Sequence, residues 1–450
     1  MDNIQGIPYT QVRFDKDGKR LSQPAVPANT TDLIVVSHGW NNTEADAVDL
    51  YTKLFTNFAN LTKDDPAYAG RKVAILGVIW PAQKFDDLMT QIEGSGKASG
   101  GAKSLGAGDK AEAEKTMREA IERVRPLFQE PGDEARLAKL EELTKLVPKL
   151  ETDSAAQETF VKTIRQLLDR GPTSAEQIHR EDASDVLFEA QPPNIFANAT
   201  KPAPATGTGQ EAAQSAAKSA AAGPVDPTGK AAGIGSFFSK AAHAVTNLMN
   251  LTTYFEMKQR AGTVGKNGVA PLIDSLAGVD RIHLVGHSFG GRVVAATAAS
   301  SSTKKLHSMS LLQAAFSHNG FSKIGHGFFR SVIEQKRVAG PIIITHTKND
   351  KAVGTAYPAA SRISGDISKA FGDAKDRFGG LGRNGAQQME NAEISGSAKE
   401  LLESKKGYNF EAGHIHNLLS DTFIVDPKGG DAHGFVFVPQ VAWAISRAML

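Results

Sequence analysis

A serine framed by glycines has the clearest capacity for chemistry in this sequence. Ser288 stands in residues 286–290, which read Gly-His-Ser-Phe-Gly. In a Gly-x-Ser-x-Gly segment, a sharp turn from a strand into a helix holds the serine in strained backbone angles, and its small neighbours relieve the crowding. A chain with 43 glycines can carry this pattern by chance, so the surrounding residues decide what it means.

The residues on both sides of Ser288 provide the setting that such a turn needs. Residues 282–285 (Ile-His-Leu-Val) form a strand-like run that leads directly into the turn, and residues 292–300 are the small residues of a closely packed helix. Strand, glycine turn and helix together predict a nucleophile elbow with Ser288 at its tip. A flexible glycine turn without chemistry is the alternative reading.

A serine hydroxyl becomes a nucleophile when a histidine takes its proton and a carboxylate orients that histidine. Asp350 follows a predicted strand at residues 341–345, and a loop at that strand's carboxyl end would bring it beside Ser288. His433 precedes a predicted last helix, where the base of such a site is expected. The alternative for Asp350 is a solvated turn aspartate.

Two further histidines compete with His433 for the role of base. His414 and His416 are two residues apart, so they would share one face of an extended chain. They could form a supporting pair, a metal-binding pair or the base itself. No third ligand is identified near them, so the sequence predicts neither a metal site nor a cofactor.

Acyl transfer also needs N–H donors for the negative oxygen of its transition state. The residue after the nucleophile, Phe289, supplies one backbone N–H. The second donor is expected from residues 37–40 (Ser-His-Gly-Trp), because His38-Gly39 at a strand end lets the backbone direct the N–H of Trp40 toward the serine. A simple tight turn at Gly39 is the alternative.

Alternating strands and helices must position these residues. Buried apolar runs predict strands at residues 33–36, 73–80, 282–285, 309–312 and 341–345. Helices are expected after the capping-box residues 43–46, at 292–300, around 328–335 and at 441–450. This alternation predicts an α/β fold with a mainly parallel central sheet flanked by helices.

A long helical insertion interrupts that pattern and divides the chain into three parts. Residues 1–85 and 246–450 form the two parts of the core, and residues 86–245 form a mostly helical insertion, expected to act as a lid or cap. Residues near 196–235 are rich in small residues and are expected to be a mobile linker. A second low-hydrophobicity stretch, roughly 364–406, is expected to be an irregular surface excursion.

Composition narrows the functional classes. The chain has 450 residues, with 51 Lys and Arg against 49 Asp and Glu, so its overall field favours neither nucleic acid nor an anionic membrane as partner. It has no cysteine, which excludes disulfides and thiolate catalysis. We see no membrane span and no secretory signal in residues 1–24, so a cytoplasmic location is expected by default and signal-independent export stays open.

The strand end at His38-Gly39, the serine segment, Asp350 and a late histidine together resemble the α/β-hydrolase superfamily, specifically its esterase and lipase branches. The resemblance covers roughly residues 30–85 and 245–450. It implies an α/β-hydrolase fold and cofactor-free hydrolysis of a carboxylic ester through an acyl-serine intermediate. The substrate would be a small-molecule or lipid ester.

The resemblance also implies a role for each site residue. Ser288 would be the nucleophile of a catalytic triad, with His433 as base and Asp350 as its orienting acid. Trp40 and Phe289 would be the oxyanion donors. The chain departs from many lipases by continuing as Trp-Asn-Asn at residues 40–42 instead of further glycines, and the insertion is not shared across the superfamily. The substrate therefore does not follow from the resemblance.

Two other kinds of function fit the same residues. A serine peptidase, amidase or thioesterase would use the same constellation. A non-catalytic binding protein could retain the fold and use the insertion as its partner surface.

Overall fold

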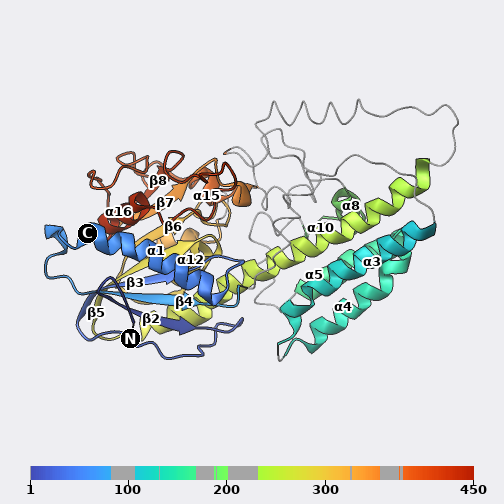
Figure 1. Ribbon diagram of the computed structural model, residues 1–450, viewed down its shortest axis with the longest axis horizontal. Helices are drawn as coiled ribbons and strands as arrows, with labels where there is room; N and C mark the ends of the chain where they lie inside the picture. Colours follow the sequence, from blue (N-terminus) through green and yellow to red (C-terminus); the bar gives the residue numbers. More distant parts are fainter. Residues whose placement is uncertain are drawn as a thin grey trace.

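The computed structural model of the protein describes residues 2–82, 107–130, 132–168, 187–188, 190–200, 232–324, 327–354, 374 and 379–450. Its centre is an eight-stranded sheet in the order β1-β2-β4-β3-β5-β6-β7-β8, in which β1 alone is antiparallel to its neighbour (Figure 1). The strands are β1 (Asp2–Ile4), β2 (Ile7–Arg13), β3 (Thr30–Ser37), β4 (Val73–Ile79), β5 (Val279–His287), β6 (Leu306–Leu312), β7 (Ile342–His346) and β8 (Ile415–Leu419).

Both faces of this sheet are buried, which explains why its central strands are continuously apolar. Successive side chains of a strand point to opposite faces. In β3, Leu33 and Val35 belong to one buried cluster, while Ile34 and Val36 belong to another on the opposite face. The mainly parallel sheet between two layers, predicted from the sequence, is therefore present.

Helices complete the two layers. Helices α1 (Glu44–Thr62) and α16 (Pro439–Ala448) cover the face of Ile34. The capping box predicted at the start of α1 is confirmed, because Thr43 and Asp46 exchange the two hydrogen bonds that define it. Helix α12 (Phe289–Ser300), helix α11 (Ala270–Asp274) and part of a long helix, α10 (Ala232–Thr263), cover the other face.

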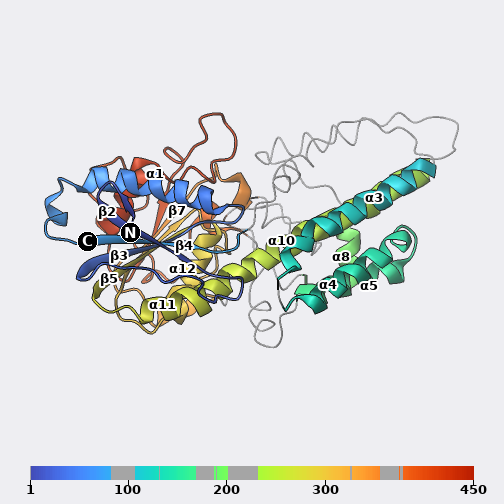
Figure 2. The ribbon, with the colours of Figure 1, turned by 60° about the horizontal axis from the view of Figure 1, so that its bottom comes forward.

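The helical insertion lies between β4 and β5, and its predicted end at residue 245 falls within α10. Its helices pack with one another and along the outer part of α10, as both ribbon views show (Figures 1 and 2). They are α3 (Ala107–Val124), α4 (Glu134–Leu146), α5 (Ser154–Leu168) and α8 (Pro192–Ala199). Helix α10 runs without interruption from this insertion to the sheet, where a π-helical segment, Val264–Val269, continues it.

Helix α12 and the π-helical segment approach each other closely. A methyl group at Gly265 would lie 2.3 Å from the carbonyl oxygen of Val293 and 2.8 Å from Cβ of Ala296. Such distances are far inside van der Waals contact, so only glycine allows the two elements to pack this way.

The structure adds strands and moves some boundaries relative to the sequence predictions. All five predicted strands are present, but β4 ends at Ile79, before Trp80, and α12 begins at Phe289 and not at Arg292. Strands β1, β2 and β8 were not predicted. Helices α8 and α10 enter the segment predicted as a mobile linker, and residues 201–231 of that segment lie outside the described residues.

The second low-hydrophobicity stretch is described only at residues 374 and 379–406. These residues contain the short helix α15 (Leu381–Asn384), whose first residue is fully buried. Among the described helices, none is long and apolar enough to cross a bilayer.

Candidate active site

Ser288 occupies a strained turn between β5 and α12. It is the residue before the first turn of α12 and has φ 55° and ψ −125°. A positive φ is uncommon for a residue with a side chain and costs free energy that the surrounding fold must supply. A methyl group at Gly286 would lie 2.3 Å from the oxygen of Gly290, and one at Gly290 would lie 2.1 Å from the oxygen of Ser37. The two glycines that frame the serine are thus required by close backbone contacts.

Asp350 and His433 form a hydrogen-bonded pair. His433 Nδ1 lies 2.9 Å from Asp350 Oδ2, and the aspartate is completely buried. The other carboxylate oxygen accepts the backbone N–H of Val353 at 2.9 Å. Because an ionised carboxylate only accepts hydrogen bonds, Nδ1 carries the proton and Nε2 of the neutral ring is left as the proton acceptor.

The electrostatic surroundings of His433 favour its protonated form. Burial acts to lower the pKa of His433, but the negative charge of Asp350 and its hydrogen bond to the ring act in the opposite direction, and the net result is a pKa above the ordinary value of 6.5. An imidazolium that forms during a reaction would therefore be stabilised at this position.

The loop that carries His433 docks on the residue preceding the serine. His287 Nε2 lies 2.9 Å from the carbonyl oxygen of His433, and the two rings pack with centroids 4.9 Å apart. Burial lowers the pKa of His287 to about 3, so its ring is neutral and Nε2 donates to the carbonyl. Ala432 N–H also donates to the oxygen of Asn349 at 3.1 Å, which joins this loop to the one carrying Asp350.

The fold thus brings the turn at Ser288, His433 and Asp350 to one place. Among the described residues, Ser288 Oγ makes no hydrogen bond, and the His433 side chain bonds only Asp350. Contacts between nucleophile and base are often long before substrate binds.

The loop after β3 holds one peptide group in a defined orientation. Trp80 N–H donates to His38 Nε2 at 3.3 Å, so His38 carries its proton on Nδ1, which donates to the oxygen of Gly39 at 2.9 Å. Asn42 Nδ2 donates to the same oxygen at 3.1 Å and to the oxygen of Trp40 at 3.1 Å. Burial lowers the pKa of His38 to about 4, which keeps the ring neutral. Because a peptide group is planar and trans, holding the Gly39 oxygen also fixes the direction of the Trp40 N–H.

This peptide group lies against Ser288. A methyl group at Gly39 would lie 2.6 Å from Cβ and 3.1 Å from Oγ of Ser288. The ring of Trp40 packs on that of Phe289 with centroids 5.9 Å apart. Phe289 is the first residue of α12, where backbone N–H groups have no partner within the helix. Within the described part of the chain, neither the Trp40 nor the Phe289 N–H donates a hydrogen bond, so both are available beside Ser288.

Gln313 supports the carboxylate and was not identified from the sequence. It directly follows β6, is completely buried and has φ 44°. Its Nε2 lies 3.5 Å from Asp350 Oδ2 and 3.1 Å from the oxygen of Gly382, while Thr345 Oγ1 donates to its Oε1 at 2.8 Å. A single glutamine at a strand end carries no sequence signal, because its role depends on the neighbouring strand.

The two competing histidines lie elsewhere. His416 is buried within β8, and its Nε2 accepts the N–H of Glu411 at 3.0 Å. His414 stands just before β8, at the amino-terminal edge of the sheet, whereas Asp350 lies beyond the carboxyl end of the parallel strand β7. Of the three histidines, the structure brings His433 alone to Asp350.

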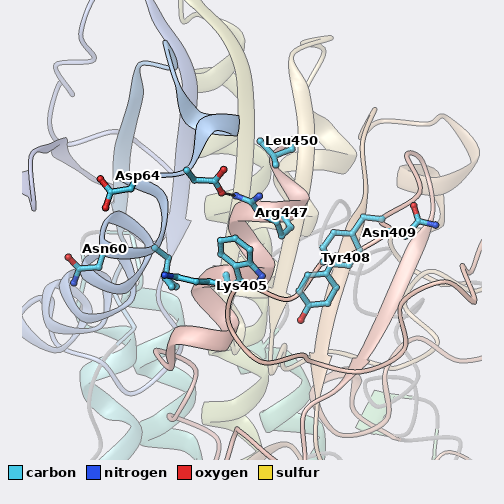
Figure 3. A pocket seen from close by; sticks show the side chains of 12 residues that line it. Asn60, Asp64, Lys405, Tyr408, Asn409, Arg447 and Leu450 are labelled. Atoms are coloured by element: carbon cyan, nitrogen blue, oxygen red, sulfur yellow. Dashed lines mark hydrogen bonds and ion pairs between the residues drawn. The ribbon is translucent and has the colours of Figure 1, made fainter.

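A surface pocket of about 720 Å³ lies away from these residues, where α1 and α16 end (Figure 3). Asp64, Tyr408 and Arg447 contribute to its lining, and no residue of the candidate active site does. In the described ranges, no group of three or more histidine, aspartate or glutamate side chains is arranged to hold a metal ion.

Comparison with known protein families, with curated proteins and with solved structures gives no match to the chain. Only the geometry of the residues themselves therefore indicates what the chain does.

Proposed function

We propose that the chain is a serine hydrolase of the α/β-hydrolase type that cleaves carboxylic esters. The observation that carries this proposal is the meeting of a strained serine at a strand-to-helix turn with a hydrogen-bonded His433–Asp350 pair. Their order along the chain, Ser288, Asp350, His433, is that of enzymes with a nucleophile elbow. A strained backbone conformation such as that of Ser288 is typical of residues in functional sites.

In this mechanism, Ser288 Oγ attacks the ester carbonyl carbon while His433 Nε2 takes its proton. The carbonyl π electrons move to the oxygen, and the N–H groups of Trp40 and Phe289 stabilise the resulting oxyanion. When the intermediate collapses, the bond to the leaving alcohol breaks and His433 returns the proton to that alcohol. Water then attacks the acyl-serine by the same steps, releases the acid and restores the serine. Asp350 stabilises the imidazolium in both halves.

The preference for an ester over other acyl compounds comes from the resemblance to esterases and lipases. A peptidase, amidase or thioesterase would use the same groups. Chromogenic esters of graded chain length, compared with matched amides and thioesters, test this preference. A larger kcat/KM for an amide or thioester than for the best ester would contradict it.

A covalent probe separates catalysis from a purely binding role. A fluorophosphonate should label the wild type at Ser288, and labelling should be lost in Ser288→Ala. Ser446→Ala is a matched control, because Ser446 is a buried serine on α16, away from the elbow. An unlabelled, folded wild type would show that the protein is not a serine hydrolase and would favour the binding alternative.

The helical insertion is proposed to act as a cap that controls access to Ser288. Helix α10, which emerges from the insertion, places Tyr254 against Phe289 with ring centroids 5.4 Å apart. The helix that leads out of the proposed cap thus contacts a proposed oxyanion donor, which supports a role for the cap in selecting the acyl chain. Substitutions on the side of the insertion that faces Ser288 should change the enzyme's preference among esters with acyl chains of graded length.

A further inference from the structure

Three charged side chains meet in the interior between the insertion and the sheet. Arg260 of α10 and Glu256 one turn earlier are both almost completely buried, and Arg260 Nε lies 3.0 Å from Glu256 Oε1. Arg136 of α4 approaches the other oxygen of Glu256 at 2.6 Å. Buried charges of this kind are retained when each has a partner with good geometry. Glu256 therefore connects α10 to the insertion.

The remaining N–H groups of Arg260 reach two carbonyl oxygens in different parts of the molecule. Nη2 donates to Leu127 of the insertion at 2.6 Å, and Nη1 donates to Pro81 at 3.4 Å. Leu127 lies in the 3₁₀ turn Arg125–Phe128, whereas Pro81 follows β4 closely along the chain. A guanidinium can hold several acceptors at once because its donors form a rigid planar fork.

The residues on either side of Pro81 hold the loop that follows β3, residues 38–42, which carries Trp40 and is called the oxyanion loop. Trp80 donates its backbone N–H to His38 Nε2 and its indole N–H to the oxygen of His38 at 3.1 Å, and the two rings stack with centroids 5.5 Å apart. The oxygen of Ala82 accepts the N–H of Asn41 at 2.9 Å. The short segment after β4 therefore contacts Arg260 on one side and the loop that carries Trp40 on the other.

Helix α10 also contacts the element that provides the second donor. Arg292 of α12 donates from Nε to the oxygen of Lys258 at 2.8 Å, and Tyr254 packs on Phe289. One helix is thus connected to both sides of the proposed oxyanion site.

From these contacts we infer that Arg260 is a positioning residue, through which the helical insertion holds the oxyanion loop in its working geometry. This inference rests on the proposed hydrolase function. It makes the insertion a determinant of the chemical step as well as of access. Losing an oxyanion donor lowers kcat by roughly 10²- to 10³-fold in known acyl-transfer enzymes, so displacing one is expected to cost about tenfold or more.

The test compares Arg260→Met and Arg260→Lys with the wild type on a short, soluble ester. In Arg260→Met, kcat should fall about tenfold or more while KM changes less than about threefold, because the Arg260 side chain is almost completely buried and is not exposed to a substrate. Arg260→Lys keeps a positive charge beside Glu256 but lacks the planar guanidinium that reaches several acceptors at once. Its kcat should therefore lie between those of Arg260→Met and the wild type. If the methionine variant does not fold, the lysine variant carries the test.

Arg71→Met is the matched control. Arg71 pairs at 3.0 Å with the buried Asp32, which lies near the start of β3, whereas the oxyanion loop follows the end of that strand. Losing Arg71 therefore also disturbs a buried charge but does not disturb the oxyanion loop. Its kcat should stay within about twofold of the wild type. A larger effect there would show that general destabilisation explains the Arg260 result and would overturn the inference.

A double-variant cycle with Asn42→Ala identifies the route of the effect. If Arg260 acts through the oxyanion loop, the losses in kcat should be clearly less than multiplicative in the double variant, because both residues then stabilise the same loop. Multiplicative losses, or Arg260 variants with kcat within twofold of the wild type, would overturn the inference. A wild type that no fluorophosphonate labels would instead overturn the proposed function itself.

Discussion

His287 donates a hydrogen bond from Nε2 to the carbonyl oxygen of His433, 2.9 Å away, although 146 positions separate them in the chain. The residue that precedes the proposed nucleophile thus holds the backbone of the proposed base. Asp350 holds the ring of the same histidine through Nδ1. The geometry of His433 depends on both contacts.

His287→Phe keeps an aromatic ring against His433 but removes the donor, which leaves a carbonyl oxygen unpaired at a cost of about 1–3 kcal/mol. We expect kcat to fall about tenfold with little change in KM, since 1.4 kcal/mol corresponds to a factor of ten. Steady-state kinetics measures this, with His414→Phe as control. Equal kcat in the two variants would contradict a positioning role for His287.

Replacing the carboxylate should have a larger effect. Asp350→Asn preserves the size of the side chain but removes the charge that stabilises the imidazolium and fixes its tautomer. The corresponding change in a well-studied Ser-His-Asp protease lowers kcat about 10⁴-fold, and we expect a loss of roughly 10³- to 10⁴-fold here. Circular dichroism should show an intact fold. A loss of less than about tenfold would remove Asp350 from the triad.

The pH dependence of kcat/KM should report the raised pKa of His433. The base works when neutral, so activity is lost as pH falls through its pKa, which lies above 6.5 because Asp350 outweighs the effect of burial. Asp350→Asn removes the negative charge that raises the pKa of His433 but leaves the burial that lowers it. The acid limb of the pH profile should therefore move to lower pH. A limb that stays in place or moves upward would show that another group controls it.

The strained angles of Ser288 predict a gain in stability when activity is removed in one particular way. Glycine adopts φ near 55° without strain, so Ser288→Gly should recover about 1–3 kcal/mol, less about 0.5–1 kcal/mol for the flexibility of glycine in the unfolded chain. The net gain is about 1 kcal/mol, measurable as a higher Tm. Ser288→Ala keeps the strain and serves as control. Equal Tm values for Ser288→Gly and Ser288→Ala would contradict the presence of backbone strain at Ser288.

The close approach of α12 to the end of α10 and to the π-helical segment after it allows a matched pair of glycine substitutions. A methyl group at Gly265 meets the backbone of Val293 at 2.3 Å, whereas one at Gly262 meets the end of the Arg292 side chain at 3.4 Å. Gly265→Ala should lower the free energy of unfolding by about 1–3 kcal/mol through overpacking. Gly262→Ala should be neutral or raise it by up to about 1 kcal/mol, because alanine favours helix. Urea unfolding distinguishes them, and the opposite order would contradict this packing.

The parts of the fold that follow from local patterns were predictable. Continuous apolar runs identified the buried strands, and the spacing of Thr43 and Asp46 identified the start of α1. Strands β2 and β8 were not predicted because they lie toward the edges of the sheet and carry polar residues. The sequence of β2, for example, is Ile-Pro-Tyr-Thr-Gln-Val-Arg. The start of α12 at Phe289 was also not predicted, because glycine has a low helix propensity. Tertiary contacts hold Gly290 and Gly291 in the first turn of the helix.

For the candidate site, order along the chain and position after a strand were enough to select Ser288 and Asp350. The sequence favoured His433 as the base but left His414 and His416 as alternatives, because it did not show that residues 415–419 form a strand which buries His416. The contributions of Gln313 and Arg260 depend entirely on which loops meet in space. No local pattern reveals such contacts.

The insertion has a consequence for how the protein folds. It stands between β4 and β5, yet β5 pairs with β3, so Val36 lies opposite Val285 in the middle of the sheet. Contacts between residues so distant in sequence slow folding, because the ends of a long segment must meet before they gain any stabilisation. Helix formation within the insertion would shorten that search. We therefore expect the chain to fold slowly, with the helices of the insertion acquiring hydrogen-exchange protection before the central strands.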